Sequence, residues 1–485
     1  MSKYYLRVEA VNFHYFLDDT DKIQPMRGGS YLLLESINSL EGLSVNGVTL
    51  QKIMAGASIG LFSFELKDDS KTDNIIDAVR QELHNQTDGH ATFVVNVLKA
   101  TGTFKHDIET VTAMNRWQQF QQPTLMLPEN PADERCPYDG IRPVEGTINT
   151  AEGPKNVSSS VAYRTEEGKK LRKKIYKKIL DDDTFNEDFT DDLEELSYNP
   201  DKGNLHNKIA LIYFDGNKFS KIRGDSCNNE VFLRAFSECV EEYRSTFLNK
   251  LLEEAKKGDF KNKGKIQIET LLWGGDELEI VVPAWKGWEV LKLFYESMKN
   301  AEYKYNKYNG IPLTHAGGIV FTNHKSPIRQ LRNIVRNLTD MTKERLPSVY
   351  KTLNHGEHDL THYLIMESFD TVGTDVRRFV GDYYGDGYYD DFVLTSTMIE
   401  NITNALTRMK KNNFPHNKVF EIVSVVKTDS SAQATLRIED ILKRALSDVE
   451  DEDAVKDAIN GVIDGKPHRW LMLADLWDYV GGNYA

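Results

Sequence analysis

The stretch LLWGGDELEIVVPAW, residues 271–285, places two glycines and two acids between two apolar runs. Side chains alternate in character on both sides of this bend, at positions 266, 268, 270 and 272 before it and at 278, 280 and 282 after it. A period of two is typical of β-strands, and a glycine-containing bend between two such runs is typical of a hairpin turn. The sequence therefore predicts a β-hairpin with GGDE, residues 274–277, at its tip.

The elements around this hairpin predict a split βαβ sheet. KIALIYF, residues 208–214, has the pattern of a buried strand, and apolar residues at helical spacing follow it between 231 and 247. Helix, strand, helix and strand are then predicted by the runs at 288–301, 314–323, 326–343 and 362–369. The resulting order, β-α-β-β-α-β-α-β, is that of a split βαβ sheet with helices on one face.

Two aspartates are brought together by this arrangement. Asp215 ends the first strand, and in a split βαβ sheet that strand lies beside the hairpin strands, so Asp215 approaches Asp276 at the hairpin tip. Adjacent carboxylates repel each other, and a divalent cation removes that cost. On its own, however, Gly-Gly followed by an acid is also a common turn. With both halves present we predict a site for Mg²⁺ or Mn²⁺, with ligands from Asp215, Asp276, Glu277 and the carbonyl of Gly216.

Such a site suits nucleotidyl transfer. Two metal ions about 3.5–4 Å apart activate an attacking 3′-hydroxyl and stabilise the α-phosphate and the leaving pyrophosphate. Asp215, Asp276 and Glu277 are the predicted catalytic residues. Gly274 and Gly275 lack side chains where a triphosphate or a base must approach the backbone. Nucleotide contacts are also predicted for the turn after Asp215, namely for Gly216, Asn217, Lys218 and Phe219.

These motifs carry a resemblance to a known family. KIALIYFDGNKFSKI, LLWGGDELEIVVP and the run 314–343 resemble the second palm domain of the large polymerase/cyclase subunit of type III CRISPR effector complexes. They are more distantly similar to the GGDEF domain of diguanylate cyclases. YFLDDTDKIQPMRGGSYLLLESI, residues 15–37, resembles the first, non-catalytic palm of the same subunit. The resemblance implies two facing palms that join ATP into cyclic oligoadenylates through 3′–5′ bonds, with Lys343 near the triphosphate.

Three departures from the family pattern qualify this resemblance. The family often begins with an HD nuclease, whereas this sequence begins directly in a palm, so no DNase activity is expected. A cysteine pair that makes a zinc ribbon is reduced to Cys136. The motif is GGDE, not the GGDD that is usual in these cyclases, and a glutamate at that position is typical of diguanylate cyclases. The base used and the product formed therefore stay open.

The predicted fold class is α+β, with two ferredoxin-like palms and a helical C-terminal domain. In the first palm, strands are expected at 4–11, 55–66 and 90–100, and helices at 28–40 and 71–83. The predicted domains are the first palm (1–105), a connector (106–204), the catalytic palm (205–375) and the helical domain (376–485).

Two motifs of the first palm have open interpretations. RGGS, at 27–30, is expected to open a helix, and the N-terminal amides at Gly28, Gly29 and Ser30 would hold a phosphate of a second nucleotide. Packing of this helix start against the other palm is the alternative. The acids of DDT, residues 18–20, would form a vestigial metal site, although no matching acid is evident at that domain's hairpin tip.

Composition limits the location and the partners of the chain. The formal net charge is −14, which argues against binding of duplex DNA over the whole protein surface. No apolar run approaches the roughly 18 residues of a membrane span, and we expect a cytoplasmic protein without membrane contacts. Three cysteines without CxxC spacing suggest reduced thiols. Basic residues at 169–178 fit a solvated helix, with RNA or phosphate binding as the less specific alternative.

The leading functional hypothesis is an enzyme that converts ATP into a cyclic oligonucleotide second messenger by two-metal catalysis, in CRISPR-type antiviral defence. One alternative is a diguanylate-type synthase that uses GTP. The other is a non-catalytic scaffold that binds RNA or protein within a CRISPR effector complex. Nucleoside triphosphates are the predicted ligands, with ATP foremost, and RNA, effector subunits or further copies of the chain are the open partners.

Overall fold

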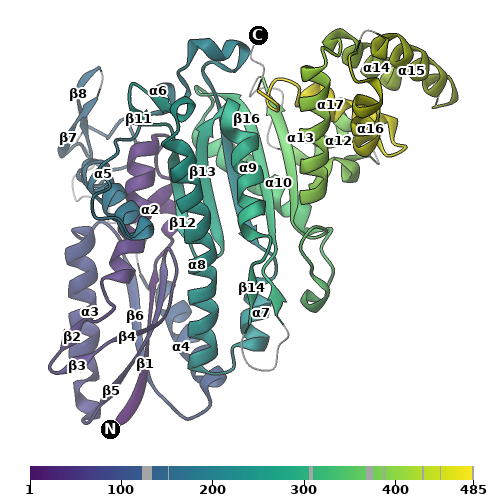
Figure 1. Ribbon diagram of the computed structural model, residues 1–485. Coiled ribbons are helices and arrows are strands. Elements are labelled where there is room, and N and C mark those ends of the chain that lie inside the picture. The colour runs from purple at the N-terminus through teal and green to yellow at the C-terminus, as the bar shows by residue number, and fades with distance from the viewer. Residues whose placement is uncertain are drawn as a thin grey trace.

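The computed structural model describes residues 1–122, 134–150, 152–304, 310–367, 375–385, 388–428, 431–447 and 449–482. An N-terminal sheet, a second and larger sheet, and a group of C-terminal helices follow one another along the chain (Figure 1). None of the described helices combines the length and the apolar character needed to cross a membrane. The mixed α+β class predicted from the sequence is confirmed.

The first sheet has four strands in the order β4-β5-β1-β6, and every neighbouring pair is antiparallel. This is the strand order of a split βαβ unit. Its elements are β1 (Ser2–Ala10), α1 (Phe13–Leu17), α2 (Ile23–Asn38), β2 (Ser44–Val45), β3 (Val48–Thr49), β4 (Gln51–Ala55), β5 (Ile59–Leu66), α3 (Thr72–Thr87), β6 (Phe93–Lys99) and α4 (Phe104–Gln119).

Two expectations for this sheet are wrong. The single strand predicted at 55–66 is the second half of a hairpin, because the chain turns between Ala55 and Ile59 and β4 precedes the turn. The helix predicted to open at 28 begins at Ile23. Pro25 lies in its first turn, where a missing N–H costs nothing because that amide has no partner inside the helix.

The second sheet has six strands in the order β12-β13-β9-β16-β17-β18. Its elements are β9 (Lys208–Gly216), α7 (Phe219–Ser226), α8 (Glu230–Ala255), β10 (Lys261–Asn262), β11 (Lys265–Ile266), β12 (Glu269–Gly274), β13 (Glu277–Pro283), α9 (Ala284–Met298), β14 (Glu302–Tyr303), β15 (Ile311–Pro312), β16 (His315–Asn323), α10 (Ile328–Lys343) and β17 (Leu360–Met366). The predicted hairpin and the predicted order of the main elements are confirmed. A sixth strand, β18 (Val393–Thr395), comes from within the range 376–485 that was expected to be helical.

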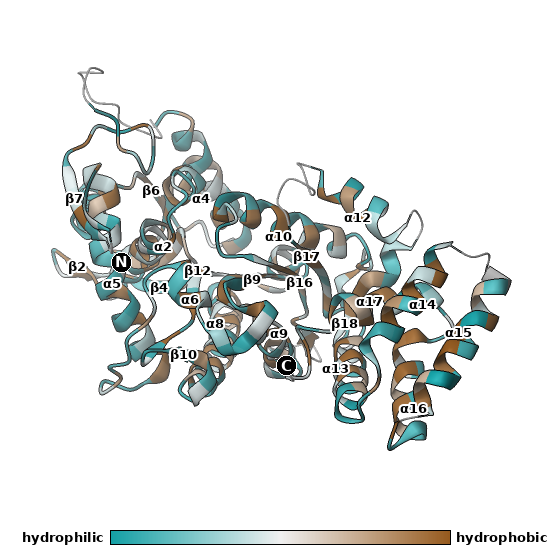
Figure 2. Ribbon diagram, turned by 90° about the horizontal axis from the view of Figure 1, so that it is seen from above, coloured by the Kyte–Doolittle hydropathy of each residue, from teal (hydrophilic) through white to brown (hydrophobic). Residues whose placement is uncertain are grey.

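Helices cover both faces of the second sheet, not one as expected. Seen from above, the strands lie between α8 and α9 on one side and α10 on the other (Figure 2). Phe214 of β9 stacks on Phe294 of α9 with ring centroids 3.6 Å apart, an arrangement worth about 0.5–1.5 kcal/mol beyond the area buried. The neighbouring residue Tyr213 points to the opposite face, towards Arg336 of α10. Burial on both faces explains why IALIYF, residues 209–214, is apolar without interruption.

The connector packs its long helix onto the first sheet's helix α2. Its elements are β7 (Gly146–Thr150), β8 (Gly153–Val157), α5 (Ser159–Leu180) and α6 (Leu193–Ser197). A Cβ added at Gly28 of α2 would lie 1.7 Å from the backbone oxygen of Arg164, and one at Gly168 of α5 would lie 2.6 Å from the Cα of Gly28. The two helices therefore cross at a distance that only glycines permit.

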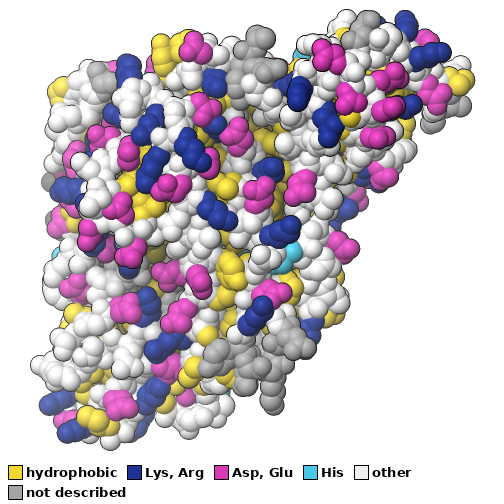
Figure 3. All heavy atoms as spheres, viewed as in Figure 1, with side chains coloured by type: hydrophobic (Ala, Val, Ile, Leu, Met, Phe, Trp, Pro, Cys, Tyr) yellow, Lys and Arg dark blue, Asp and Glu magenta, His cyan; other side chains and the backbone are white. Residues whose placement is uncertain are grey.

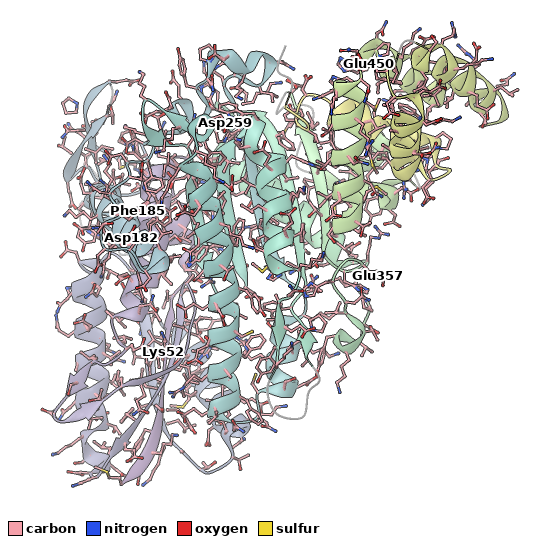
Figure 4. The ribbon with its side chains drawn as sticks, in the orientation of Figure 1. Lys52, Asp182, Phe185, Asp259, Glu357 and Glu450 are labelled. Carbon is pink, nitrogen blue, oxygen red and sulfur yellow. The ribbon has the colours of Figure 1, made fainter. Side chains whose placement is uncertain are left out.

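The basic residues of the connector helix have partners within the protein. Lys173 contacts Asp188 at 2.7 Å and Lys174 contacts Glu35 at 2.5 Å. On the face shown in Figure 3, acidic and basic side chains are interspersed. Asp182 and Phe185, labelled in Figure 4, follow the end of this helix. The centroid of the Phe185 ring lies 5.7 Å from the ammonium of Lys256, the residue after α8. The lysines at 173 and 174 agree with a solvated face, whereas Arg172 is buried against Glu269, so only one side of this helix faces solvent. These contacts give no separate support to RNA binding.

The C-terminal region packs as helices beside β17 and β18. These are α12 (Val376–Tyr384), α13 (Ser396–Lys411), α14 (His416–Thr428), α15 (Ser431–Leu446), α16 (Glu452–Ile463) and α17 (Trp470–Asp475). Asp475 accepts hydrogen bonds from Tyr383 at 2.9 Å and from Tyr363 of β17 at 3.2 Å. A partly buried carboxylate thus ties the last helix to the second sheet.

The two sheets are joined by reciprocal contacts between their helices and edge strands. Helix α2 packs against β12, and α8 packs against β4. Arg27 of α2 contacts Glu269 of β12 at 2.5 Å, and both side chains are almost fully buried. Breaking a buried ion pair by removing one partner is strongly destabilising, so this contact fixes how the two sheets meet.

Replacing Gly28 by alanine is expected to destabilise the protein, because the new methyl group would collide with the backbone of α5. Overpacking of this kind costs about 1–3 kcal/mol. Gly461 of α16 is a matched control, since a Cβ there meets nothing within 4 Å, and Gly461→Ala should stabilise by roughly 1 kcal/mol through helix propensity. Thermal unfolding followed by circular dichroism compares the two. A Gly28→Ala protein that melts at or above the wild-type temperature would contradict the close helix crossing.

Candidate active site

Asp215 and Glu277 lie opposite each other on neighbouring strands. β9 pairs with β13 in a register that sets Asp215 against Glu277 and Tyr213 against Glu279. Residues directly opposite in an antiparallel pair point to the same face, with Cβ atoms about 4.5–5.5 Å apart. The carboxylates of Asp215 and Glu277 therefore share the face of the sheet that α10 covers. The expectation that Asp215 lies next to the hairpin tip agrees with this geometry.

The tip itself is held by contacts on three sides. The Gly216 amide donates to the backbone oxygen of Asp276 at 3.2 Å, and Arg244 of α8 donates to the carbonyl of Gly275 at 2.6 Å. Gly275 has a φ of +57°, a left-handed conformation that favours glycine. A Cβ at Gly274 would lie 2.1 Å from the Cβ of Ala57 in the first sheet's hairpin turn. Close packing against the first domain thus accounts for Gly274, where the sequence suggested room for a nucleotide.

The environment of the tip disfavours ionisation of Asp215 and Asp276. Burial raises the pKa of Asp215 to about 6; the Lys343 ammonium opposes this rise, and the nearby charges of Asp276 and Glu277 add to it. The pKa of Asp276 is also raised, mainly by burial and further by Glu277, while Arg223 and Lys343 act in the opposite direction. A positive charge bound here would relieve both penalties.

Lys343 and Tyr213 hold two of the three carboxylates. Lys343, the last residue of α10, forms an ion pair with Asp215. Tyr213 donates its hydroxyl to Glu277 at 2.7 Å, and burial next to Glu277 raises the pKa of that phenol far above its usual value. Lys343 therefore lies at the site, as the resemblance implied, but its contact here is a carboxylate. Tyr213 was missed, although its position two residues before Asp215 already placed it on the same face.

The turn after β9 uses most of its side chains inside the protein. Asn217 is fully buried and donates to the hydroxyl of Thr314 at 3.0 Å and to the carbonyl of His358 at 2.8 Å. Phe219 is buried against the rings of Phe236 and His315. These contacts give both residues a role in shaping the turn. Lys218, with a φ of +58°, is only partly buried and stays accessible from solvent.

The predicted phosphate site at RGGS has the wrong geometry. Gly28, Gly29 and Ser30 lie in the interior of α2, five or more residues after its start at Ile23, and all three are buried. Their amides therefore lie inside the helix's own hydrogen-bonding ladder. The glycines serve the crossing with α5, which is the packing alternative considered from the sequence.

A cavity of about 220 Å³ adjoins the hairpin tip and is lined by both domains. The first domain contributes the turn at 54–59 and Phe13, and the second contributes α7, α8 and the tip itself. Asp276 and Glu277 line this cavity together with Arg223 and Glu241. Arg223 and Arg244 were missed from the sequence, because lone arginines on helices carry no motif that distinguishes them from surface residues.

The donor chemistry at the tip suits a hard divalent cation, but the carboxylates are not assembled around one point. Carboxylate oxygens are the ligands that Mg²⁺ and Mn²⁺ prefer. Among the residues that the structure describes, however, no group of three or more His, Cys, Asp or Glu side chains is close enough to hold a metal ion. Asp215 is instead paired with Lys343, and Glu277 accepts a hydrogen bond from Tyr213.

The segment HGEHDLTH, residues 355–362, and the three cysteines carry side-chain types that can bind metals, and their contacts here are structural. His355 contacts Asp359 at 2.8 Å and the carbonyl of Ala301 at 2.9 Å. Glu357 lies on the loop near the edge of the molecule (Figure 4) and accepts a hydrogen bond from Asn354. Cys136, Cys227 and Cys239 are free thiols.

Comparisons with known proteins locate the fold. No protein-family model matches the sequence, and no curated protein matches it. Among solved structures, Csm1 of T. onnurineus matches 97% of this chain and 70% of its own, with a TM-score of 0.52 and 13% identity. A Csm1–Csm4 cassette in complex with pppApA matches 98% of this chain and 69% of its own, with a TM-score of 0.50 and 12% identity.

At such low identity the likeness concerns the fold. It agrees with the similarity to the large CRISPR subunit that the sequence motifs indicated, while the more distant GGDEF similarity stays an inference from the motif. The chain has the fold of Csm1.

Proposed function

We propose that the chain is a nucleotidyltransferase that converts ATP into a cyclic oligonucleotide second messenger in CRISPR-type antiviral defence. The observation that carries the proposal is the register of β9 and β13, which sets Asp215 beside Glu277 with Asp276 at the adjoining turn. Strand-end carboxylates beside a cavity between two domains suit a divalent cation and a phosphate-bearing substrate.

The fold likeness supports the choice of substrate and partner. One Csm1–Csm4 cassette of similar fold is described in complex with pppApA, an adenosine dinucleotide with a triphosphate. We therefore assign an adenine nucleotide to this chain as substrate and a Csm4-like subunit as partner. The palm description of the two sheets and the two-metal chemistry belong to this proposal as well.

The chain's own residues have distinct tasks in this reaction. Asp215, Asp276 and Glu277 would hold Mg²⁺ or Mn²⁺, together with the carbonyl of Gly216. When bound, these ions supply activation of the 3′-hydroxyl and charge neutralisation at the phosphates. Lys343, released from Asp215, would bind triphosphate oxygen. Arg244 keeps the turn in place through the Gly275 carbonyl, and the first domain's turn at 54–59 shields one side of the cavity.

Replacing Asp276 by asparagine should lower the rate of oligonucleotide synthesis at least about a hundredfold, because one metal ligand is worth several kcal/mol of transition-state stabilisation. Incubation with labelled ATP or GTP and Mn²⁺, followed by phosphatase treatment and chromatography, detects the cyclic product and its base. Asp340→Asn, an exposed change on α10, is the control and should keep wild-type activity. Wild-type rates in the Asp276→Asn protein would refute the assigned site, and consumption of GTP alone would favour the diguanylate-type alternative.

Binding of Mn²⁺ should weaken as the pH falls below about 6, because the ligand Asp215 has its pKa raised to about 6 and binds a cation only when ionised. Lys343 holds that pKa down, so Lys343→Met should move the midpoint of the binding-versus-pH curve to higher pH. Calorimetric titration with Mn²⁺ between pH 5 and 8 measures both midpoints. Lys351→Met, at an exposed lysine, is the control. A midpoint that stays unchanged or moves to lower pH in Lys343→Met would contradict the pairing.

A further inference from the structure

The acids of the DDT motif have separate partners. Asp18 forms an ion pair with Arg332 of α10 in the second domain. Asp19, the next residue, binds Arg164 through both carboxylate oxygens at 2.9 Å and Arg142 at 2.5 Å, which are both connector residues. Neither acid is directed at a cation site. Asp18 joins the first domain to the catalytic half, and Asp19 joins it to the connector.

Arg332 links Asp18 to the strand that carries the candidate metal ligand. Its Nε lies 2.5 Å from Glu279 of β13, and both side chains are almost completely buried. Arg336, one turn further along α10, lies 3.2 Å from the other oxygen of Glu279. Glu277 and Glu279 lie two residues apart on the same strand, so both side chains point to the face covered by α10. Two arginines on one helix are therefore fixed by one buried glutamate and by Asp18.

The contacts continue from Arg336 to Glu277. The Arg336 guanidinium lies 5.5 Å from the centroid of the Tyr213 ring, within the range of a cation–π contact. The hydroxyl of Tyr213 in turn donates to Glu277. An unbroken series of side-chain contacts thus leads from Asp18 in the first domain through Arg332, Glu279 and this arginine–tyrosine pair to the candidate metal ligand.

The same helix also orients Lys343. Arg332, Arg336 and Lys343 are spaced by four and seven residues and therefore lie on one face of α10. The position of α10 consequently sets two contacts at the site, that of Lys343 with Asp215 and that of the Tyr213–Arg336 pair with Glu277.

We propose that Asp18 is a positioning residue for Glu277, acting through Arg332 and the α10 face; the inference rests on the proposed function of the site. Arg332 is buried, and its Nη2 has no hydrogen-bond partner among the described residues. Loss of the Asp18 charge leaves this cation with Glu279 alone. A buried charge that loses one of its partners is destabilised in its position. Arg332 and α10 are therefore expected to shift, and Glu277 is expected to shift with them.

Neighbouring aspartates provide a matched experiment. Asp18→Asn removes the charge that pairs with Arg332, Asp19→Asn removes the charge that pairs with Arg164 and Arg142, and each should lower the melting temperature. Only Asp18→Asn should weaken Mn²⁺ binding, by about 10–100-fold, the usual effect of losing a residue that orients a metal ligand. The same variant should lower kcat with little change in KM for the triphosphate, and Asp18→Glu should restore both values. Calorimetry with Mn²⁺ on the full chain is the primary measurement.

Equal loss of Mn²⁺ affinity in the two asparagine variants, or unchanged affinity in Asp18→Asn, would overturn the inference and leave Asp18 a purely structural residue. If Asp18→Asn does not fold, Tyr213→Phe tests the other end of the series, where the same weakening is expected and unchanged affinity would be decisive against it. A wild-type chain that binds Mn²⁺ but forms no product would refute the proposed function, and the Mn²⁺ titrations would still decide the role of Asp18.

Discussion

The register between β9 and β13 is the constraint on which the candidate site depends. A slip of one residue would send every side chain of a strand to the opposite face, so Asp215 and Glu277 would no longer face α10. Burial of β9 on both sides specifies this register strongly, since Phe214 must meet α9 while Tyr213 meets α10. The apolar core therefore fixes the placement of the polar groups at the strand end.

The candidate site also depends on how the two sheets pack against each other. Gly274 at the tip of the β12–β13 hairpin packs against Ala57 of the first domain, and the buried pair of Arg27 with Glu269 holds the adjoining helix and strand. The first domain lacks an acid at its own tip, where Ser58 and neighbouring Ile59 stand in the sequence. Its contribution to the site is a wall of the cavity and a set of ionic contacts.

The sequence was sufficient for the hairpin, the order of the main elements and the approach of Asp215 to the tip, because periods of two and 3.6 and strand adjacency are local or topological properties. The predicted role of Gly28 and Gly29 is wrong, since a pair of glycines suggests a helix boundary and only the long-range crossing with α5 shows another use. Arg332 and Asp18 could not be paired in advance, because more than 300 residues separate them and each alone resembles a surface charge.

The contact of Ala57 with Gly274 has a mechanical consequence. The backbone of Gly274 packs so closely against Ala57 that no further atom fits between the turn of the first domain and the turn that bears Asp276. A displacement of the first domain towards the second would therefore push directly on the acidic turn. The orientation of the first domain and the position of the acidic turn are therefore coupled through this contact.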